Sequence, residues 1–180
     1  MAVEGVKRMR HWILAGAVAL LPLAAVAEVK FAAADGFLIE HRFEIKAPAT
    51  KVWEALLHPE NWWPSDHTWS GERANLSLSG QAGGCFCERW AGGSVEHGRV
   101  VMAMPASLLR LSAALGPLQE MGVTGVITFA LDEKDGTTIL VATHRVSGDA
   151  AHKLDALAPI VDQVNALQFG GVTRAVGGAP

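Results

Sequence analysis

The helical pattern of residues 154–169 constrains the fold more than any other stretch of this chain. At about 100° per residue, its large apolar side chains fall on one face of a helix, while Asp155, Asp162 and Gln163 fall outside that face. The apolar set comprises Leu157, Ile160, Val161, Val164 and Leu167. Only the surface of a sheet is wide enough to cover such a face, and the preceding residues supply strand-like runs. We therefore expect a sheet that closes around one C-terminal helix.

Two residues of this helix bear on a possible pocket. Gln168 lies near the middle of the apolar face, where a buried amide needs hydrogen-bond partners or a polar group in a cavity. Pro159 has no N–H for the carbonyl four residues earlier, so a straight helix through it would lose about 3 kcal/mol. We expect either that the main helix begins near Ala158, after a separate turn, or that one helix bends at Pro159. A bend would open a pocket between the helix and the strands that carry Phe129 and His144.

The residues between 37 and 147 have the pattern of an antiparallel meander. Residues 37–45 alternate between apolar and polar side chains, which places His41 on the buried face of the first strand. A short helix starts at Thr50 or Ala49, and glycine and proline residues separate the later runs. These later strands are expected at 75–79, 84–90, 95–104, 108–113, 123–131 and 137–147. The pattern predicts an α+β fold with two short helices after the first strand.

Residues 1–27 have the pattern of an export signal. Three basic residues precede an apolar run over 12–26, and Ala25-Val26-Ala27 has the small residues of a cleavage site. The run is shorter than the roughly 20 apolar residues that span a bilayer, so we expect cleavage and no lasting membrane anchor. The mature protein would begin at Glu28 and would be periplasmic or secreted.

Length and charge indicate one domain and narrow the class of partner. Without residues 1–27 the chain has 153 residues, which suits a single core. It then carries 12 basic and 17 acidic residues, for a net charge of −5, which disfavours nucleic acid and anionic lipid surfaces as partners. We expect a linker at 28–36, the domain at 37–169 and a flexible, glycine-rich tail at 170–180.

Residues 59–72 carry three tryptophans in a stretch that prolines and a glycine keep from forming a long regular element. The rings of Trp62, Trp63 and Trp69 either cap the core or form the wall of a ligand site, since an aromatic ring with a polar edge suits an amphipathic molecule. Asp66 and His67 are adjacent and point in different directions, so we do not expect them to act as a catalytic pair.

The motif Cys85-Phe86-Cys87 is the most suggestive chemistry in the chain. In a regular strand, residues i and i+2 stand too far apart for a disulfide, so a bridge needs a bulge or a turn, which Gly83-Gly84 would permit. The motif allows two packed thiols, a strained or redox-active disulfide, or a metal site. We favour the packed thiols and expect neither a metal nor a cofactor.

Glu88 and His144 are candidate polar groups on the inner face of the sheet. Glu88 shares the aromatic face of its strand, where a carboxylate needs a partner, and Arg99 or Arg110 on a neighbouring strand could supply it. A pocket with Glu88, His144 and His41 could perform acid–base chemistry. The sequence contains no nucleophile elbow, phosphate loop or dinucleotide-binding motif.

Four motifs resemble the START-like (SRPBCC) helix-grip superfamily: APATKVWEAL, AGGCFCERW, GRVVMAMPASLLRL and TGVITFALDEKDGTTILVATHRVSG. This superfamily includes Bet v 1 allergens, polyketide cyclases and Hsp90-activator homologues, and the chain looks like an exported, uncharacterised bacterial branch of it. The resemblance covers residues 37–169 and implies a curved sheet of six or seven strands around the final helix, with a largely apolar cavity between them. It implies no particular reaction. Relatives extend the helix where this chain has Gly170-Gly171, so we expect a shortened helix.

These observations favour a binding protein over an enzyme. We expect it to hold a small hydrophobic or amphipathic molecule between the sheet and the C-terminal helix. The candidate ligand-binding residues are His41, Trp62, Trp63, Trp69, Glu88, Trp90, Phe129, His144, Val164 and Gln168. The alternatives are a cyclase- or hydrolase-type enzyme that uses Glu88 and His144, and a thiol or metal protein centred on Cys85 and Cys87.

Overall fold

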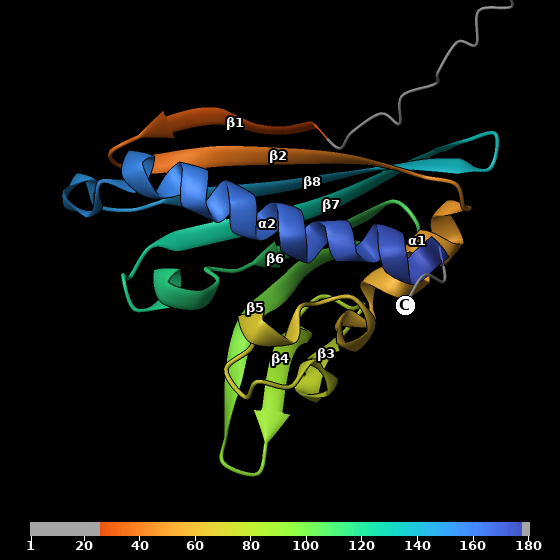
Figure 1. The fold of residues 1–180 in the computed structure, drawn as a ribbon, viewed down its shortest axis with the longest axis horizontal. Coiled ribbons are helices and arrows are strands. Elements are labelled where there is room, and N and C mark those ends of the chain that lie inside the picture. The colour runs from red at the N-terminus through yellow and green to blue at the C-terminus, as the bar shows by residue number, and fades with distance from the viewer. Residues whose placement is uncertain (1–25, 178–180) are drawn as a thin grey trace, which may run out of the picture.

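A computed structural model describes residues 26–177 and shows one curved antiparallel sheet with a long helix, α2 (Leu154–Gly177), across one face (Figure 1). The sheet has the strand order β1-β2-β8-β7-β6-β5-β4-β3. The strands are β1 Val26–Ala33, β2 Gly36–Ile45, β3 Leu76–Leu78, β4 Cys85–Trp90, β5 Gly93–Met104, β6 Leu108–Ser112, β7 Thr124–Lys134 and β8 Thr137–Ser147. The predicted α+β helix-grip architecture is confirmed, with one strand more than expected.

Strand β1 is the additional strand. It pairs antiparallel with β2, from Val26 opposite Arg42 to Ala33 opposite Gly36. The segment 28–36, expected as a linker, is therefore mostly strand, because β2 would otherwise present an unpaired edge. The export signal predicted for residues 1–27 lies outside the described residues except for its last two. Cleavage there would leave most of β1 in place.

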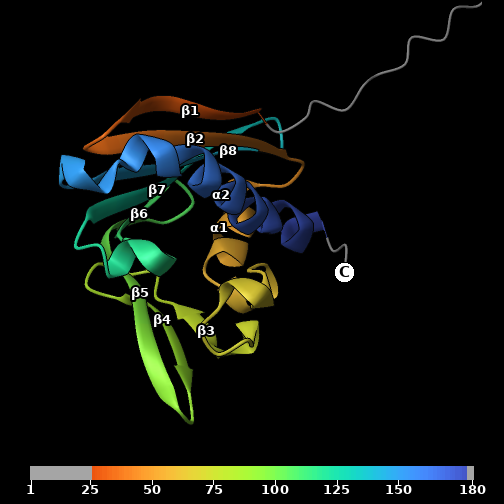
Figure 2. The same cartoon turned by 60° about the vertical axis from the view of Figure 1, so that its left-hand side comes forward.

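The helix predicted after the first long strand is α1 (Ala49–Leu56), which buries Val52, Trp53 and Leu56. The second short helix expected there is replaced by three 3-10 turns, η1 (Pro59–Asn61), η2 (Ser65–His67) and η3 (Arg73–Asn75). Prolines at positions 59 and 64 remove backbone donors that a longer helix would need. Figure 2 shows this segment below α1 and beside β3.

Helix α2 passes through Pro159 without interruption. A separate 3-10 turn, η5 (Ala150–His152), precedes it. The N–H of Leu154 donates to the carbonyl of Ala34 at 2.9 Å, which ties the first turn of the helix to the β1–β2 turn. The main helix therefore begins at Leu154. The alternative in which a new helix begins near Ala158 is wrong. Pro159 lies on the exposed side of one continuous helix.

The C-terminal end of α2 corrects a second expectation. Residues 170–177 continue the helix and are not a flexible tail, while 178–180 lie outside the described residues. Gly170 and Gly171 are buried, and a Cβ on Gly171 would collide with the carbonyl oxygen of Trp62. The glycine pair does not end the helix. It permits a close approach of the helix to residues 59–72, which we call the tryptophan segment.

The face of α2 that packs on the sheet lies about a quarter of a turn from the face predicted by apolar periodicity. Its buried residues include Leu154, Ala158, Asn165, Phe169 and Val172. By contrast, Ile160 is 61% and Leu167 is 57% exposed. The orientation follows the closest contacts of the helix, which involve glycine, alanine and asparagine. A count of large apolar residues gives no weight to these small and polar side chains.

Two hydrophobic clusters hold α2 at its two ends. The larger cluster contains Phe169 and Val172 together with residues of α1 and of strands β2 and β4 to β8. The smaller cluster contains Leu154 and Ala158, packed with Phe37 of β2 and with residues of the β6–β7 connection. The stretch of helix between these two anchors is where the candidate site lies.

Cys85 and Cys87 form a disulfide that encloses a single residue, with 5.3 Å between their Cα atoms. Residues i and i+2 of a regular strand stand about 6.5 Å apart, so β4 is locally contracted here, beside a bulge of β5 in which His97 is the extra residue. The expectation of packed free thiols is therefore wrong, and the disulfide alternative is the one observed. Within residues 26–177, no group of three or more histidine, cysteine or acidic residues could hold a metal ion.

The described part of the chain also bears on membrane insertion. Neither α1 nor α2 combines the length and apolar character required of a membrane-crossing helix.

Candidate functional site

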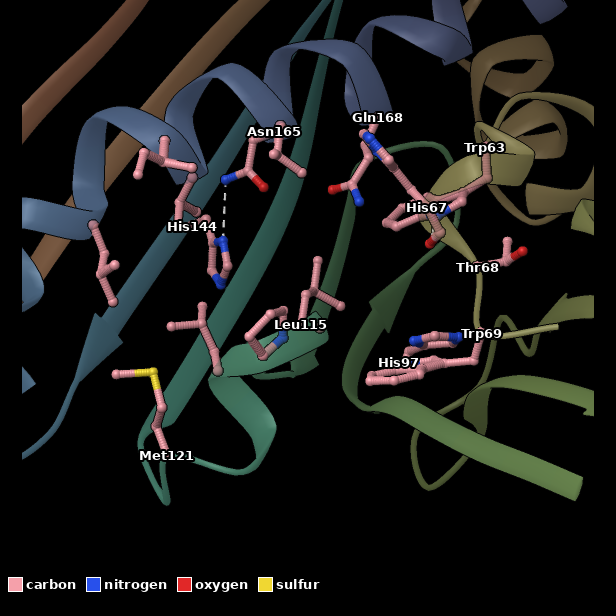
Figure 3. Close-up of a pocket in the computed structure, with 17 residues that line it drawn as sticks. Trp63, His67, Thr68, Trp69, His97, Leu115, Met121, His144, Asn165 and Gln168 are labelled. Atoms are coloured by element: carbon pink, nitrogen blue, oxygen red, sulfur yellow. Dashed lines mark hydrogen bonds between the residues drawn. The ribbon is translucent and has the colours of Figure 1, made fainter. Parts of the chain in front are cut away.

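A cavity of about 480 Å³ lies under the N-terminal half and middle of α2 (Figure 3). Its walls come from α2, from the tryptophan segment, from single histidines of β5 and β8, and from the β6–β7 connection. The lining is mainly apolar and includes Trp63, Trp69, Leu115, Pro117, Leu118, Met121, Leu157, Ile160, Val161 and Val164. This volume and this composition are typical of sites for small organic molecules.

The floor of the cavity is the β6–β7 connection, which contains the 3-10 turn η4 (Gly116–Gln119). Gly116 has φ of 54°, a backbone conformation that glycine adopts without strain, and it turns the chain into η4. Leu118 is buried in the smaller hydrophobic cluster and anchors the turn. The connection thus bridges the space below α2 and leaves it unfilled.

His144 of β8 presents a hydrogen-bond donor to this cavity. The amide nitrogen of Asn165 lies 3.0 Å from its Nδ1, and because that nitrogen can only donate, the imidazole proton is on Nε2. Burial lowers the pKa of His144 to about 4, so the ring is neutral at pH 7. Within residues 26–177, its Nε2 is buried and has no well-aligned hydrogen-bond partner.

Gln168 and His67 add two more polar atoms of this kind. Gln168 is only 5% exposed, and Figure 3 shows its amide directed from α2 into the cavity. In the described chain, the Oε1 atom of Gln168 and the Nδ1 atom of His67 are buried without a hydrogen-bond partner. Both residues line the cavity, so a bound molecule could supply the missing partners.

Glu88 and His97 form a buried pair, of which only His97 lines the cavity. His97 Nε2 lies 3.0 Å from the Glu88 carboxylate, which also accepts from the backbone N–H of Trp69 at 3.1 Å and of Ser70 at 2.5 Å. Burial raises the pKa of Glu88, but the hydrogen bonds from Ser70, Trp69 and His97 outweigh it and hold the pKa below its ordinary value. The carboxylate is therefore ionised at neutral pH and also ties down the loop that carries Trp69.

The partners expected for Glu88 are corrected by these contacts. Arg99 instead pairs with Glu96, and Arg110 donates to the hydroxyl of Thr128. Neither arginine reaches the inner face, because both side chains lie on the opposite side of their strands. Glu88 is bonded to His97, and His144 is bonded to Asn165, so the acid–base pair suggested by the sequence is not formed.

His41 is buried as predicted, at 1% exposure, but it lies outside the cavity. Its Nε2 is 3.1 Å from Asp162 Oδ1, although the two groups are not aligned for a hydrogen bond. Burial lowers the pKa of His41, while Asp162 opposes that change, so the ring is neutral at pH 7. Asp162 was expected on the solvent side of the helix, and the rotation of α2 turns it inward instead.

The structure divides the ten candidate residues into two equal groups. Those that line the cavity are Trp63, Trp69, His144, Val164 and Gln168. Those that lie elsewhere are His41, Trp62, Glu88, Trp90 and Phe129. Trp62 and Phe129 belong to the larger hydrophobic cluster, and Trp90 folds over the β4–β5 turn, against Gly92 and Gly93. Phe129 packs edge-to-face on Phe169, so the space expected beneath the helix at that point is filled.

Sequence reasoning missed His97, Asn165 and the β6–β7 connection. Asn165 precedes Gln168 by three residues and shares its side of the helix, so periodicity could have found it. His97 follows the register shift of the β4–β5 pair, where simple alternation no longer assigns a face. The connection has no motif, and only the folded chain brings it beneath α2.

Comparison with known proteins identifies the fold and no function. No family model matches this chain, and no curated protein matches it. Among solved structures, a protein from Rhodobacter sphaeroides superposes with a TM-score of 0.56 at 16% identity, over 85% of this chain and 99% of that one. A protein from Mesorhizobium loti gives a TM-score of 0.55 at 17% identity, over 79% and 98% of the two chains.

A conserved protein of unknown function from Enterococcus faecalis is similar in the same way, with a TM-score of 0.53, 12% identity, and 85% and 77% of the two chains covered. At such low identity, a likeness of this kind shows the fold alone. The chain is thus similar to bacterial proteins that share its architecture, an antiparallel sheet with a long C-terminal helix, which is the helix-grip fold.

Proposed function

We propose that this protein binds a small hydrophobic or amphipathic molecule in the cavity under α2. The observation that carries the proposal is a mainly apolar space of about 480 Å³ into which buried, unpartnered polar atoms of His144 and Gln168 are directed. A buried polar group without a partner costs about 1–3 kcal/mol, so a molecule that supplies the partner is favoured. The apolar walls favour a ligand whose body is hydrocarbon.

The composition of α2 supports the same proposal. Leu157, Val161 and Val164 line the cavity, and the folded chain covers these side chains only in part. Such large apolar groups at a helix face gain free energy when a ligand excludes the remaining water from them. Together with the four sequence motifs, the helix-grip fold also supports our assignment of the chain to the START-like superfamily.

A cavity-filling substitution tests this proposal directly. Val164→Phe would occupy the cavity from α2, whereas Leu167→Phe on the same helix changes a side chain that is 57% exposed and does not line the cavity. Protein purified from its native host is examined by native mass spectrometry for a retained small molecule. We expect occupancy in the wild type and in Leu167→Phe, and its loss in Val164→Phe. Equal occupancy in all three, or none in the wild type, would contradict the proposal.

We also propose that the protein is exported, and is therefore periplasmic or secreted. The signal-like pattern of residues 1–27 supports this, and so does the Cys85–Cys87 disulfide, since disulfides persist in oxidising compartments. N-terminal sequencing of the protein from a periplasmic fraction should find Glu28 first. Recovery of an intact Met1 or Met9 in the membrane fraction would overturn the export proposal and leave the ligand proposal untouched.

A further inference from the structure

The ionised state of Glu88 determines where His97 carries its proton. A carboxylate can only accept hydrogen bonds, so the Nε2 of His97, at 3.0 Å, must be the donor. Burial lowers the pKa of His97, and the neighbouring Glu88 opposes that change, so the ring is neutral at pH 7. A neutral imidazole has one proton, and therefore the Nδ1 of His97 carries a lone pair.

This lone pair belongs to a residue that lines the cavity. His97 is 4% exposed, and no hydrogen bond to its Nδ1 is found among residues 26–177. The Glu88 carboxylate behind the ring strengthens Nδ1 as an acceptor, in the way that a buried carboxylate orients and polarises a functional histidine. The site therefore holds a strong acceptor on the β5 side.

The buried polar atoms of the cavity that have no partner include both an acceptor and a donor. Gln168 Oε1 is a second unpartnered acceptor, whereas His144 Nε2–H is a donor. Figure 3 shows His144 and His97 as separate polar positions with apolar side chains between them. No contact of His67 in the described chain fixes its proton, so this residue can act in either role. Among His97 Nδ1, Gln168 Oε1 and His144 Nε2, acceptors thus outnumber donors by two to one.

We propose that the cavity selects a neutral hydroxyl compound with an apolar body, such as a phenol or an alcohol, whose O–H donates to His97 Nδ1. This inference rests on the proposed function and specifies its ligand class. A carboxylate ligand offers acceptors only, would leave His97 Nδ1 unpartnered and would meet the negative charge of Glu88. A pure hydrocarbon would leave every one of these polar atoms unpaired.

A set of probes with one common ring system tests the proposal. The probes are 1-naphthol, 1-methoxynaphthalene, naphthalene and 1-naphthoate, which differ only in the polar group, and their affinities for the intact protein are measured by titration calorimetry at pH 7. We expect 1-naphthol to bind about tenfold more tightly than 1-methoxynaphthalene, because the ether cannot donate a hydrogen bond. The carboxylate should bind more weakly than both.

Glu88→Gln is the variant that reports on the carboxylate behind His97. The amide oxygen of glutamine can still accept from Trp69 N–H and from His97 Nε2–H, but the negative charge that strengthens Nδ1 as an acceptor is lost. The preference for 1-naphthol over the ether should then fall from about tenfold towards equality. A purely structural loss would weaken both probes alike and leave their ratio unchanged. Glu96→Gln, an exposed carboxylate on β5, is the matched control and should keep the wild-type ratio.

The outcomes separate this inference from the proposed function. If the ether or the carboxylate binds the wild type as tightly as 1-naphthol does, the hydroxyl proposal is overturned while ligand binding stands. If none of the four probes binds, both proposals fail. Should Glu88→Gln not fold, Gln168→Leu removes the second acceptor and is expected to lower the same ratio, and an unchanged ratio there would count against the proposal.

Discussion

The two halves of helix α2 differ in what their side chains contact. In the C-terminal half, Phe169 and Val172 are almost completely buried, and Gly171 lies against the backbone of Trp62. In the N-terminal half only Leu154, Ala158 and Asn165 are fully buried, while larger apolar side chains line a cavity or are exposed. The C-terminal half therefore stabilises the fold through close packing. The N-terminal half leaves large apolar side chains partly uncovered, and these are available to a ligand.

The largest expected effect is at Gly171. Gly171→Leu would force the helix away from Trp62, since the added Cβ meets a backbone carbonyl that cannot move aside. We expect the free energy of unfolding to fall by about 4–5 kcal/mol in urea denaturation. Gly177→Ala, at a glycine with open space around it, is the control and should change stability by less than about 1 kcal/mol. If Gly171→Leu is as stable as the wild type, the close-contact account of this half is wrong.

A pair of truncations compares the halves directly. Phe169→Ala removes a ring from the larger hydrophobic cluster and should lower the free energy of unfolding by about 3–4 kcal/mol. Val164→Ala removes methyl groups that face the cavity and should cost about 1 kcal/mol or less. Chemical denaturation measures both values. Equal losses at the two positions would show that the N-terminal half is as tightly packed as the C-terminal half.

The next effect depends on pH and acts through His144, which is bonded to the middle of α2. Its pKa is about 6.5 in the unfolded chain and about 4 in the folded protein. Between these values the unfolded chain binds a proton that the folded protein does not, so stability falls as pH is lowered through this window. His144 alone should account for a loss of about 3 kcal/mol between pH 7 and pH 4.

His144→Gln removes this titrating group, so its stability should depend less steeply on pH over the same window. Denaturation curves at several pH values provide the measurement. His41 and His97 also have lowered pKa values and contribute in the same direction, and they remain in the variant. A variant whose pH dependence equals that of the wild type would show that His144 is not held neutral by burial.

The smallest effect is expected at Pro159. Its missing N–H leaves the Asp155 carbonyl without a helical partner on the exposed side, so Pro159→Ala should raise the free energy of unfolding by about 1–2 kcal/mol. The sequence predicted a bend at Pro159 that opens the cavity, and removal of such a bend should also reduce ligand uptake. Thermal unfolding and the probe titration measure the two changes. If the variant is more stable but binds the probes with unaltered affinity, Pro159 does not determine the shape of the cavity.

Several elements could be predicted because their signals are local. The alternation of residues 37–45 and 137–147 placed β2 and β8 to within a residue, since side chains of a strand alternate whatever its partners are. The same two-residue period predicted that His41, Glu88 and His144 point inward, and all three are buried. Strand geometry also required a local distortion, a bulge or a turn, for any Cys85–Cys87 bridge, and the two Cα atoms are indeed only 5.3 Å apart.

Contacts between distant segments decided the rest. Apolar periodicity identified α2 as a helix but chose the wrong face, because Gly171 against Trp62 and Asn165 against His144 set its rotation. The partner of Glu88 is His97 and not an arginine, since a register shift in β5 turns the imidazole inward. A single sequence determines backbone periods and the polarity of each position. Which groups meet across the core, and where space is left between them, depends on close approaches that only the folded chain contains.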